Sequence, residues 1–302
     1  MPLILNGPQG TAILVPVDES GLYLWDTENA QVPTVVEESR SQSQKQSEDV
    51  SALPGVPSLP LPPVITTEHP ILLPKNLEIL GLGGSGYIYK CPGGFAYKVH
   101  ASQREVDFMK AAGDCSVTPF SRVMRNVHGV LVPCGLIMEL ATPFNFKLVP
   151  SEERATVKDE MINLVERLHS SKVGIVHGDI KPANFLRCRD GKLRLCDFDS
   201  ARLIADEDTE GWEGFVSERY VAPSRGFPKY GPPTVRDDNY ALAISIWELY
   251  TGNDALIDED MEEVLNDGRT VDVDELEDQD IRNFVRKRLR DGGAKVEAPK
   301  FY

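Results

Sequence analysis

The sequence lacks the segments that mark a secreted, disulfide-bonded or membrane-spanning protein. Its cysteines are few and scattered, without a Cys-x-x-Cys pair, so neither a disulfide framework nor a zinc site is expected (Cys91, Cys115, Cys134, Cys188 and Cys196). The first residues, MPLILNGPQG, have no basic start and no sustained apolar core, unlike a signal peptide. No run of about 20 apolar residues occurs. We therefore expect an intracellular protein, cytoplasmic or nuclear, without a membrane partner.

An excess of basic residues is also absent. The chain of 302 residues carries 32 Lys and Arg against 47 Asp and Glu, a formal net charge of −15. This balance argues against a nucleic-acid partner and favours basic protein substrates or partners. Much of the acid lies between residues 254 and 280, where a solvated surface explains it equally well. With 41% apolar residues, the chain can form one large or two modest globular domains.

The first 70 residues differ from the rest of the chain in composition. Within residues 1–30, the apolar runs 12–15 and 22–25 can pair as a hairpin, in which Pro16 would confine one run to an edge. Residues 31–70 contain SRSQSQKQSEDVS and then PGVPSLPLPP. Such a composition buries too little apolar surface to offset its ordering entropy, so we expect a disordered or extended linker there.

The most informative stretch runs from residue 173 to 201, VGIVHGDIKPANFLRCRDGKLRLCDFDSA. Two short apolar runs suggest buried strands, and polar side chains lie on the loops at their ends (His177, Asp179, Lys181, Asn184, Asp197 and Asp199). Phosphoryl transfer requires this kind of set, because the protein contributes mainly positioning and charge neutralisation. Asp179 would accept the proton of an attacking hydroxyl, and Lys181 would neutralise the phosphate. Asn184 and Asp197 offer the hard oxygen ligands that Mg²⁺ prefers.

These residues resemble the catalytic and metal loops of the protein kinase superfamily, H-x-D-x-K-x-x-N followed by D-F-x. A second motif, G-x-G-x-x-G, occurs upstream at Gly81, Gly83 and Gly86. The dinucleotide-binding motif has the same spacing but opens a helix, whereas residues 87–90 and 95–99 alternate like strands. Strand, glycine turn and strand is how the small lobe of a protein kinase begins.

The resemblance implies the nucleotide-binding residues. The three glycines would lie over the ATP phosphates, Lys98 would hold the α- and β-phosphates, and Ile88 and Ala96 would enclose the adenine, with Leu186 also at the nucleotide. Residues 103–112 look like a helix ended by Gly113, and its only glutamate, Glu105, would pair with Lys98. Strands are expected at 121–127 and 130–140. The second ends in a segment resembling the hinge that binds adenine, Met138, Glu139 and Leu140.

The second half of the chain continues the resemblance. Ser151 is placed to cap a helix whose apolar stripe ends at Leu168. Residues 217–224, SERYVAPS, resemble the end of a serine/threonine kinase activation segment, with Ser217 at the position that contacts Asp179 and Lys181. Residues 238–249 are apolar around their circumference, as in a buried helix, and Asp238 would tie it to the catalytic loop. A last amphipathic helix stops at Gly292.

The resemblance therefore implies an α+β, two-lobed protein-kinase-like fold, with a small antiparallel β lobe plus one helix and a larger, mainly helical lobe. We expect a short N-terminal segment over 1–30, the linker over 31–70, the small lobe over 71–141 and an abbreviated large lobe over 142–295. The implied activity is ATP- and Mg²⁺-dependent phosphorylation of serine or threonine in proteins.

Four departures from the family pattern leave alternatives open. Gly178 replaces the arginine that normally binds a phosphorylated activation segment, Asp199 replaces the glycine of D-F-G, Ser224 replaces a glutamate of A-P-E, and the C-terminal helices are short. HGD and DFD also resemble aminoglycoside and choline phosphotransferases, which phosphorylate small molecules, although those enzymes commonly lack Lys181 and the RYVAPS segment. A nucleotide-binding pseudokinase scaffold is the third alternative.

Overall fold

The computed structural model describes residues 3–7, 10–17, 21–25, 64–67, 78–83, 86–91, 93–206, 216–227 and 229–296. The chain divides into two compact units, one formed by residues 1–103 and 119–140 and the other by residues 104–118 and 141–302. The division at Leu140 lies next to the expected boundary between the lobes. Because the helix over 103–112 belongs to the second unit from Arg104 onward, this differs from its expected place in the small lobe.

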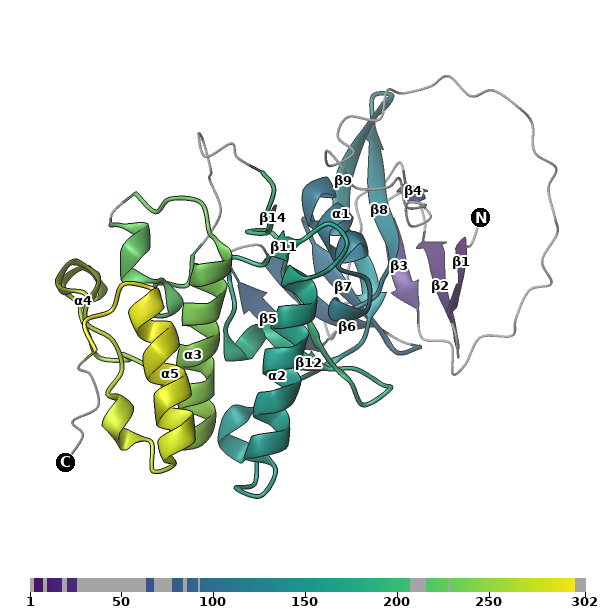
Figure 1. Cartoon of the computed structure of the whole chain (residues 1–302). Helices are drawn as coiled ribbons and strands as arrows, with labels where there is room; N and C mark the ends of the chain where they lie inside the picture. Colours follow the sequence, from purple (N-terminus) through teal and green to yellow (C-terminus); the bar gives the residue numbers. More distant parts are fainter. Residues whose placement is uncertain are drawn as a thin grey trace, which may run out of the picture. The chain divides into compact units, whose positions relative to one another are not determined.

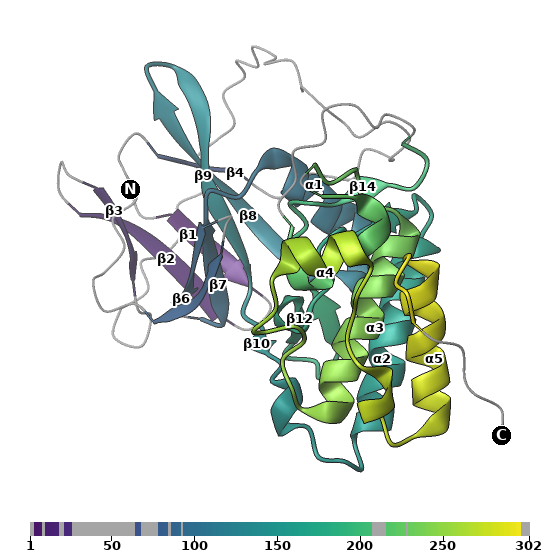
Figure 2. The same ribbon diagram turned by 90° about the vertical axis from the view of Figure 1, so that its left-hand side faces the viewer.

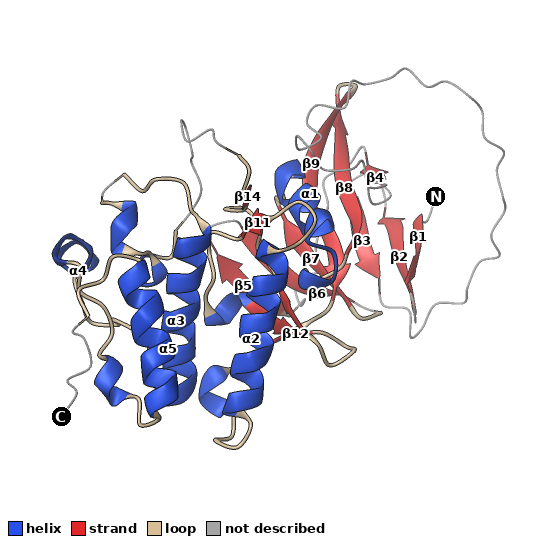
Figure 3. Cartoon of the chain, viewed as in Figure 1, coloured by secondary structure: helices blue, strands red, loops and turns tan. Residues whose placement is uncertain are grey.

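The first unit contains a six-stranded sheet, which Figure 3 draws in red. Its strand order is β4-β8-β9-β7-β6-β5, and every neighbouring pair is antiparallel except β4 and β8 (β4 Val64–Thr67, β5 Ile79–Gly83, β6 Gly86–Cys91, β7 Phe95–Val99, β8 Pro119–Val127 and β9 Val130–Glu139). One face of the sheet buries Phe95, Tyr97 and Ile137. The predicted turn between β8 and β9 forms at His128 and Gly129, both with positive φ (53° and 87°), as a two-residue hairpin requires.

Two parts of the N-terminal prediction can be compared with the structure. Strands β1 (Leu3–Gly7), β2 (Gly10–Val17) and β3 (Gly21–Trp25) form an antiparallel sheet, in which β2 and β3 make the predicted hairpin. Pro16 lies beyond Leu14, where pairing of β2 with β1 ends, so β2 is locally an edge at the proline. Strand β4 lies inside the range 31–70 expected to be a linker. Its sequence, VITT, is rich in β-branched residues and pairs with β8. The remainder of that range lies outside the described residues.

The second unit is mainly helical, and its helices are labelled in Figure 1 (α1 Gln103–Ala112, α2 Arg154–His169, α3 Val235–Thr251, α4 Met261–Asp267 and α5 Gln279–Asp291). Short 3-10 turns connect them (η3 Gly113–Cys115, η4 Phe146–Leu148, η5 Pro182–Asn184, η6 Glu218–Tyr220, η7 Pro223–Arg225 and η8 Val273–Glu275). Small antiparallel ladders carry the loops of the site: β10 (Thr142–Pro143) with β12 (Phe185–Arg187) and β13 (Leu193–Leu195), and β11 (Ile175–Val176) with β14 (Arg202–Leu203).

The helices of this unit follow the apolar patterns of the sequence. The predicted stripe of α2 is buried (Val157, Met161, Leu164, Val165 and Leu168). The expected cap at Ser151 is wrong, because α2 begins at Arg154 after Glu153, and the Ser151 hydroxyl donates to Glu152 at 3.2 Å. Helix α3 is buried on nearly all sides and ends at Gly252 in the left-handed conformation, with φ 74°.

Helices α3 and α5 lie side by side, as Figure 2 shows in green and yellow. A Cβ at Gly292, just after α5, would lie 2.5 Å from the Tyr240 ring of α3, so only glycine allows this approach. The Gly292 carbonyl accepts the Ser224 N–H at 3.2 Å. The segment end that lacks the usual glutamate is therefore held through its backbone. No helix in the described ranges is long and apolar enough to cross a membrane.

Candidate active site

The catalytic loop follows β11, and the four predicted catalytic side chains meet there, those of Asp179, Lys181, Asn184 and Ser217. The Lys181 ammonium donates to Asp179 Oδ2 at 2.6 Å and to the Ser217 hydroxyl at 2.8 Å. Asn184 Nδ2 donates to the Asp179 carbonyl at 2.7 Å and to its Oδ2 at 3.2 Å. Ser217 comes from a segment 36 residues further along the chain than Lys181. The loop therefore joins a carboxylate, an ammonium and a hydroxyl in one polar cluster.

His177 links this loop to the metal loop and is fully buried. Its Nδ1 accepts the Asp179 N–H at 3.3 Å, and its Nε2 lies 3.0 Å from the Cys196 carbonyl. A nitrogen facing a carbonyl must carry the proton, so the contacts require the neutral ring protonated on Nε2. The ring also packs on Phe198, with centroids 4.7 Å apart. His177 thus fixes the spacing between Asp179 and the strand that precedes Asp197.

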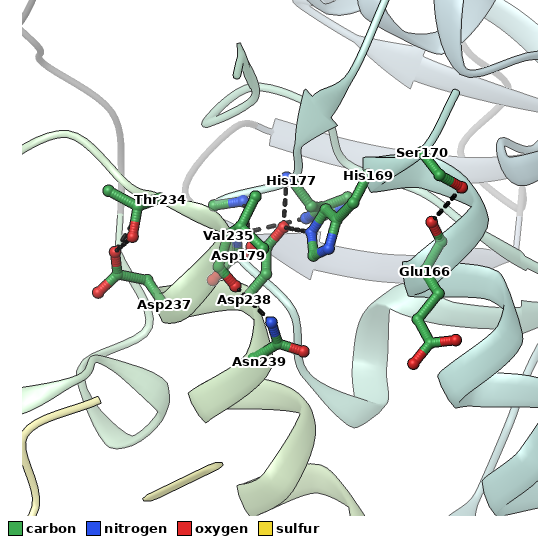
Figure 4. A network of polar contacts seen from close by, with 11 residues as sticks. Glu166, His169, Ser170, His177, Asp179, Thr234, Val235, Asp237, Asp238 and Asn239 are labelled. Atoms are coloured by element: carbon green, nitrogen blue, oxygen red, sulfur yellow. Dashed lines mark hydrogen bonds and ion pairs between the residues drawn. The ribbon is translucent and has the colours of Figure 1, made fainter. Parts of the chain in front are cut away.

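Asp238 anchors the same loop from the first turn of α3. Its Oδ2 accepts the His177 N–H at 2.7 Å, a contact drawn in Figure 4. Its Oδ1 accepts the Gly178 N–H at 2.8 Å. His169, at the end of α2, contacts Oδ2 at 2.8 Å. The predicted tie between α3 and the catalytic loop is present, and His169 is an additional partner that the sequence did not point to.

Gly178 occupies a place where no side chain fits. Its φ is +82°, and a Cβ would lie 2.6 Å from the Ser200 carbonyl oxygen and 2.8 Å from Pro233 Cγ. The glycine of HGD is therefore required by the packing of two other segments against the loop, besides its backbone conformation. The side chain that usually precedes the catalytic aspartate has no space here.

Asn184 and Asp197 were predicted to hold a metal ion. Because the Asn184 amide group donates to Asp179, its carbonyl oxygen is the atom that can act as a ligand. Ligand oxygens of Glu105, Asp197 and Asp199 lie within 4.8 Å of one another. These hard oxygen donors suit Mg²⁺. The backbone with positive φ in this loop is that of Asp197 (65°) and not that of Asp199.

The predicted nucleotide-binding residues of the first unit share one face of its sheet. Across the ladders Ile88 pairs with Lys98 and Ala96 with Met138, and the alternation along β7 puts Ala96 and Lys98 on the same side. Lys98 is buried, with 3% of its surface exposed. Gly86 has φ 123°, and a Cβ there would lie 2.7 Å from the Val99 carbonyl oxygen. The face therefore combines an apolar floor with a buried ammonium.

The glycine turn and the hinge belong to the same unit. Gly83 pairs with Gly86 and Gly81 with Ile88 across β5 and β6. Glu139 pairs with Phe95 at the end of β9, and the Leu140 N–H donates to the Gly94 carbonyl at 3.0 Å. The backbone N–H of Leu140 is thus already bonded within the unit, and the predicted adenine contact of the hinge stays a prediction.

Two predicted contacts concern both units and stay predictions. Leu186, predicted at the nucleotide, is half-buried on β12 of the second unit, opposite Pro143 and Arg194. The pairing of Lys98 with Glu105 joins residues of different units. Glu105 itself is buried on α1, with Val106, Phe108 and Met109.

A buried ionisable pair beside the site was not predicted. The Tyr220 hydroxyl lies 3.0 Å and 3.1 Å from the two carboxylate oxygens of Glu248, and Glu248 also accepts the Ala255 N–H at 2.7 Å. Burial raises the pKa of Glu248 and that of Tyr220. A glutamate inside the apolar run SISIWELY was the sequence signal that could have indicated this pair.

Comparison with known proteins gives a consistent result. A model of the protein kinase domain matches residues 75–289. Mitogen-activated protein kinase kinase 10 of Arabidopsis thaliana is 36% identical over 198 residues, 59% of this chain and 63% of that protein. A probable serine/threonine-protein kinase of Dictyostelium discoideum is 25% identical over 240 residues, 71% of this chain and 44% of that protein.

A bacterial protein matches a shorter part of the chain. The probable serine/threonine-protein kinase PknB of Lactococcus lactis is 28% identical over 123 residues, 39% of this chain and 19% of that protein. The chain thus spans less than two thirds of the length of these curated relatives.

Proposed function

Because the chain belongs to the protein kinase family, we propose that it transfers the γ-phosphoryl group of ATP, in the presence of Mg²⁺, to a serine or threonine hydroxyl of a protein. The observation that carries this proposal is the contact of Lys181 with both Asp179 and Ser217. It joins a base, a cation and the segment that precedes RYVAPS.

Asp179 orients the substrate hydroxyl and takes its proton. Lys181 and Asn184 both contact Oδ2, so we assign Oδ1 to the hydroxyl. The hydroxyl oxygen forms a bond to the γ-phosphorus while the bond from that phosphorus to the bridging oxygen of ADP breaks. The proton goes to Asp179, and Lys181 neutralises charge on the transferring group.

The nucleotide would be bound by the sheet face of the first unit. Lys98 is the cation for the α- and β-phosphates, supported by its burial next to the apolar residues Ile88 and Ala96. A bound Mg²⁺ neutralises phosphate charge during the reaction. Asn184 and Asp197 are the residues we assign to hold it, and the oxygen donors at both positions fit that ion.

The acceptor is proposed to be a protein with basic character. The net charge of −15 supports this through long-range attraction. The ordered contacts of the segment around Ser217 also favour a protein over a small molecule. Arg219 donates to the Ala255 carbonyl at 3.2 Å and Tyr220 contacts Glu248, so the segment forms a fixed surface beside Asp179.

A radiolabelled-ATP assay tests the proposal. Wild type and Asp179→Asn are offered a basic protein mixture and, separately, aminoglycosides and choline, with Mg²⁺. We expect label on serine and threonine of protein and a loss of at least about 100-fold in Asp179→Asn, the scale of losing a general base. Asp267→Asn, an exposed carboxylate with 69% of its side chain accessible, is the matched control.

Three outcomes would contradict the proposal. Unchanged activity of Asp179→Asn would remove Asp179 from its role. Label only in small molecules would favour the phosphotransferase alternative. ATP binding without transfer to any acceptor would favour a pseudokinase. In a companion variant, Lys98→Met should weaken ATP binding about tenfold or more, as expected for losing a buried charge on phosphate.

A further inference from the structure

Arg225 is a buried cation that the mechanism above does not use. It ends η7, directly after Ser224, and only 9% of its surface is exposed. Its Nε and Nη2 donate to the Gly231 carbonyl at 3.1 Å and 2.7 Å, and its guanidinium carbon lies 6.0 Å from the Tyr230 ring centroid. Burying a guanidinium is costly unless carboxylates compensate its charge, so its surroundings are informative.

Arg225 lies between the catalytic loop and the first turn of α3. Arg225 lines one small cavity together with Gly178, Asp179, Asp237 and Asp238, and it is the one cation among the described residues lining it. Burial lowers the pKa of the Arg225 guanidinium, and the carboxylates of Asp237, Asp238 and Asp179 counteract that shift. One positive charge therefore faces three carboxylates.

The three carboxylates differ in what else binds them. Asp179 has Lys181 at 2.6 Å, and Asp238 has His169 at 2.8 Å. Asp237 accepts the Thr234 N–H and hydroxyl with Oδ2, whereas its buried Oδ1 has no hydrogen-bond partner among the described residues. Asp237 is thus the carboxylate that depends most on Arg225 for compensation.

The glycine of HGD explains why a cation has to come from elsewhere. A side chain at position 178 would meet Ser200 and Pro233, so the residue before Asp179 cannot supply a positive charge to the loop. Pro233 belongs to the same connection, residues 226–234, that carries Gly231, the acceptor for Arg225. This connection both closes the space at Gly178 and holds the guanidinium beside the cavity.

We propose that Arg225 is a positioning residue that balances the charge of Asp237, Asp238 and Asp179 and thereby holds the catalytic loop in its active arrangement. This role rests on the proposed phosphoryl transfer. Asp238 carries the effect to the loop, because it binds the N–H groups of His177 and Gly178. The titratable side chains near Arg225 in the described residues are these carboxylates and the two phenols, Tyr220 and Tyr230.

Three variants test the role of the charge: Arg225→Met, Arg225→Lys and the double variant Arg225→Met/Asp237→Asn. We expect Arg225→Met to lower kcat about 10- to 100-fold with KM for ATP changed less than about threefold, since the buried carboxylates lose a compensating charge but the nucleotide site is not touched. Arg225→Lys should recover most of kcat. The double variant should exceed Arg225→Met in kcat at least about threefold, because one anion is removed with the cation.

Asp237→Asn alone and Arg269→Met are the controls. Asparagine at 237 can still accept the Thr234 N–H, and Arg269 is an exposed arginine paired with Glu259 at 2.8 Å. Arg269→Met should leave kcat unchanged. A normal kcat for folded Arg225→Met, no recovery by lysine, or strictly additive effects in the double variant would each overturn the proposal.

Two further measurements separate failure of this proposal from other failures. If Arg225→Met does not fold, recovery of folding in the double variant supports charge balance, and its absence contradicts it. If wild type transfers no phosphate to any acceptor, the proposed function fails instead. The unfolding midpoints of the four proteins in the Arg225 and Asp237 cycle then still report whether the two residues are coupled.

Discussion

The Asp238 carboxylate accepts the backbone N–H of Gly178 at 2.8 Å across 60 residues of sequence. Together with the His177 N–H at 2.7 Å, it ties the start of the catalytic loop to the first turn of α3 (Figure 4). Helix α3 is among the most buried elements of its unit. The position of Asp179 is thus set by the core and not by the loop alone.

Asp238→Asn should lower both stability and turnover. The amide keeps the size of the carboxylate but offers one acceptor oxygen where two N–H groups and His169 bind. Leaving a buried donor unsatisfied costs about 1–3 kcal/mol, and this loss should appear in the midpoint of urea unfolding, with kcat reduced more than ATP affinity. Asp267→Asn, whose side chain is 69% exposed, is the control. Equal stability of the two variants would show that the hydrogen bonds from Asp238 to the catalytic loop do not stabilise the protein.

Gly178→Ala should be more harmful than an alanine at another left-handed glycine. Gly191 has a similar φ, +78°, but a Cβ there would meet nothing within 4 Å. Gly191→Ala should therefore lower the free energy of unfolding by about 1–2 kcal/mol, the cost of placing a non-glycine residue in the left-handed conformation. Gly178→Ala adds the contacts with Ser200 and Pro233, so its unfolding midpoint and kcat should both be lower. If the two alanine variants lost stability and kcat equally, the catalytic loop would be able to move away from Ser200 and Pro233 without cost.

Removal of phosphate from the activation segment should leave activity within about twofold. The physical reason is that Gly178 has no side chain with which to bind a phosphate, while arginine is the residue suited to that contact. The measurement is the intact mass and the initial rate before and after phosphatase treatment. A loss of about tenfold, reversed by rephosphorylation, would show that another cation binds phosphate there.

Glu248 should make the stability of the protein depend on pH. Burial raises the pKa of Glu248 in the folded state above the ordinary glutamate value of 4.5, so the folded protein binds the proton more tightly than the unfolded chain. Its contribution to stability is therefore full below about pH 4.5 and is lost as pH rises through the raised folded-state value.

The comparison of wild type with Glu248→Gln measures this contribution. The variant cannot titrate, so its unfolding midpoint should fall less than that of wild type as pH is raised from 4.5. Glu277→Gln, at an exposed position, should behave like wild type. If the unfolding midpoint of Glu248→Gln fell with pH as steeply as that of wild type, Glu248 would not be the source of the pH dependence.

Local patterns in the sequence were sufficient for several of the helices and strands. Helix α1 runs over the predicted residues 103–112, and the stripe of α2 and the left-handed Gly252 after α3 follow from spacing and backbone preference. The contact of Asp179, Lys181 and Ser217 agrees with the motif. Short-range periodicity predicts such features because it reflects which side of an element is buried.

Only the tertiary structure decided which distant groups meet. That Ser200 and Pro233 close the space at Gly178, that Asp199 joins Glu105 and Asp197, and that Arg225 lies under the catalytic loop depend on contacts between segments far apart in the chain. The cap expected at Ser151 failed for a related reason, since helix ends are fixed by surrounding contacts as well as by preference. Sequence spacing identifies the charges, but their compensation is decided where the fold buries them, because burial sets the cost of an unbalanced charge.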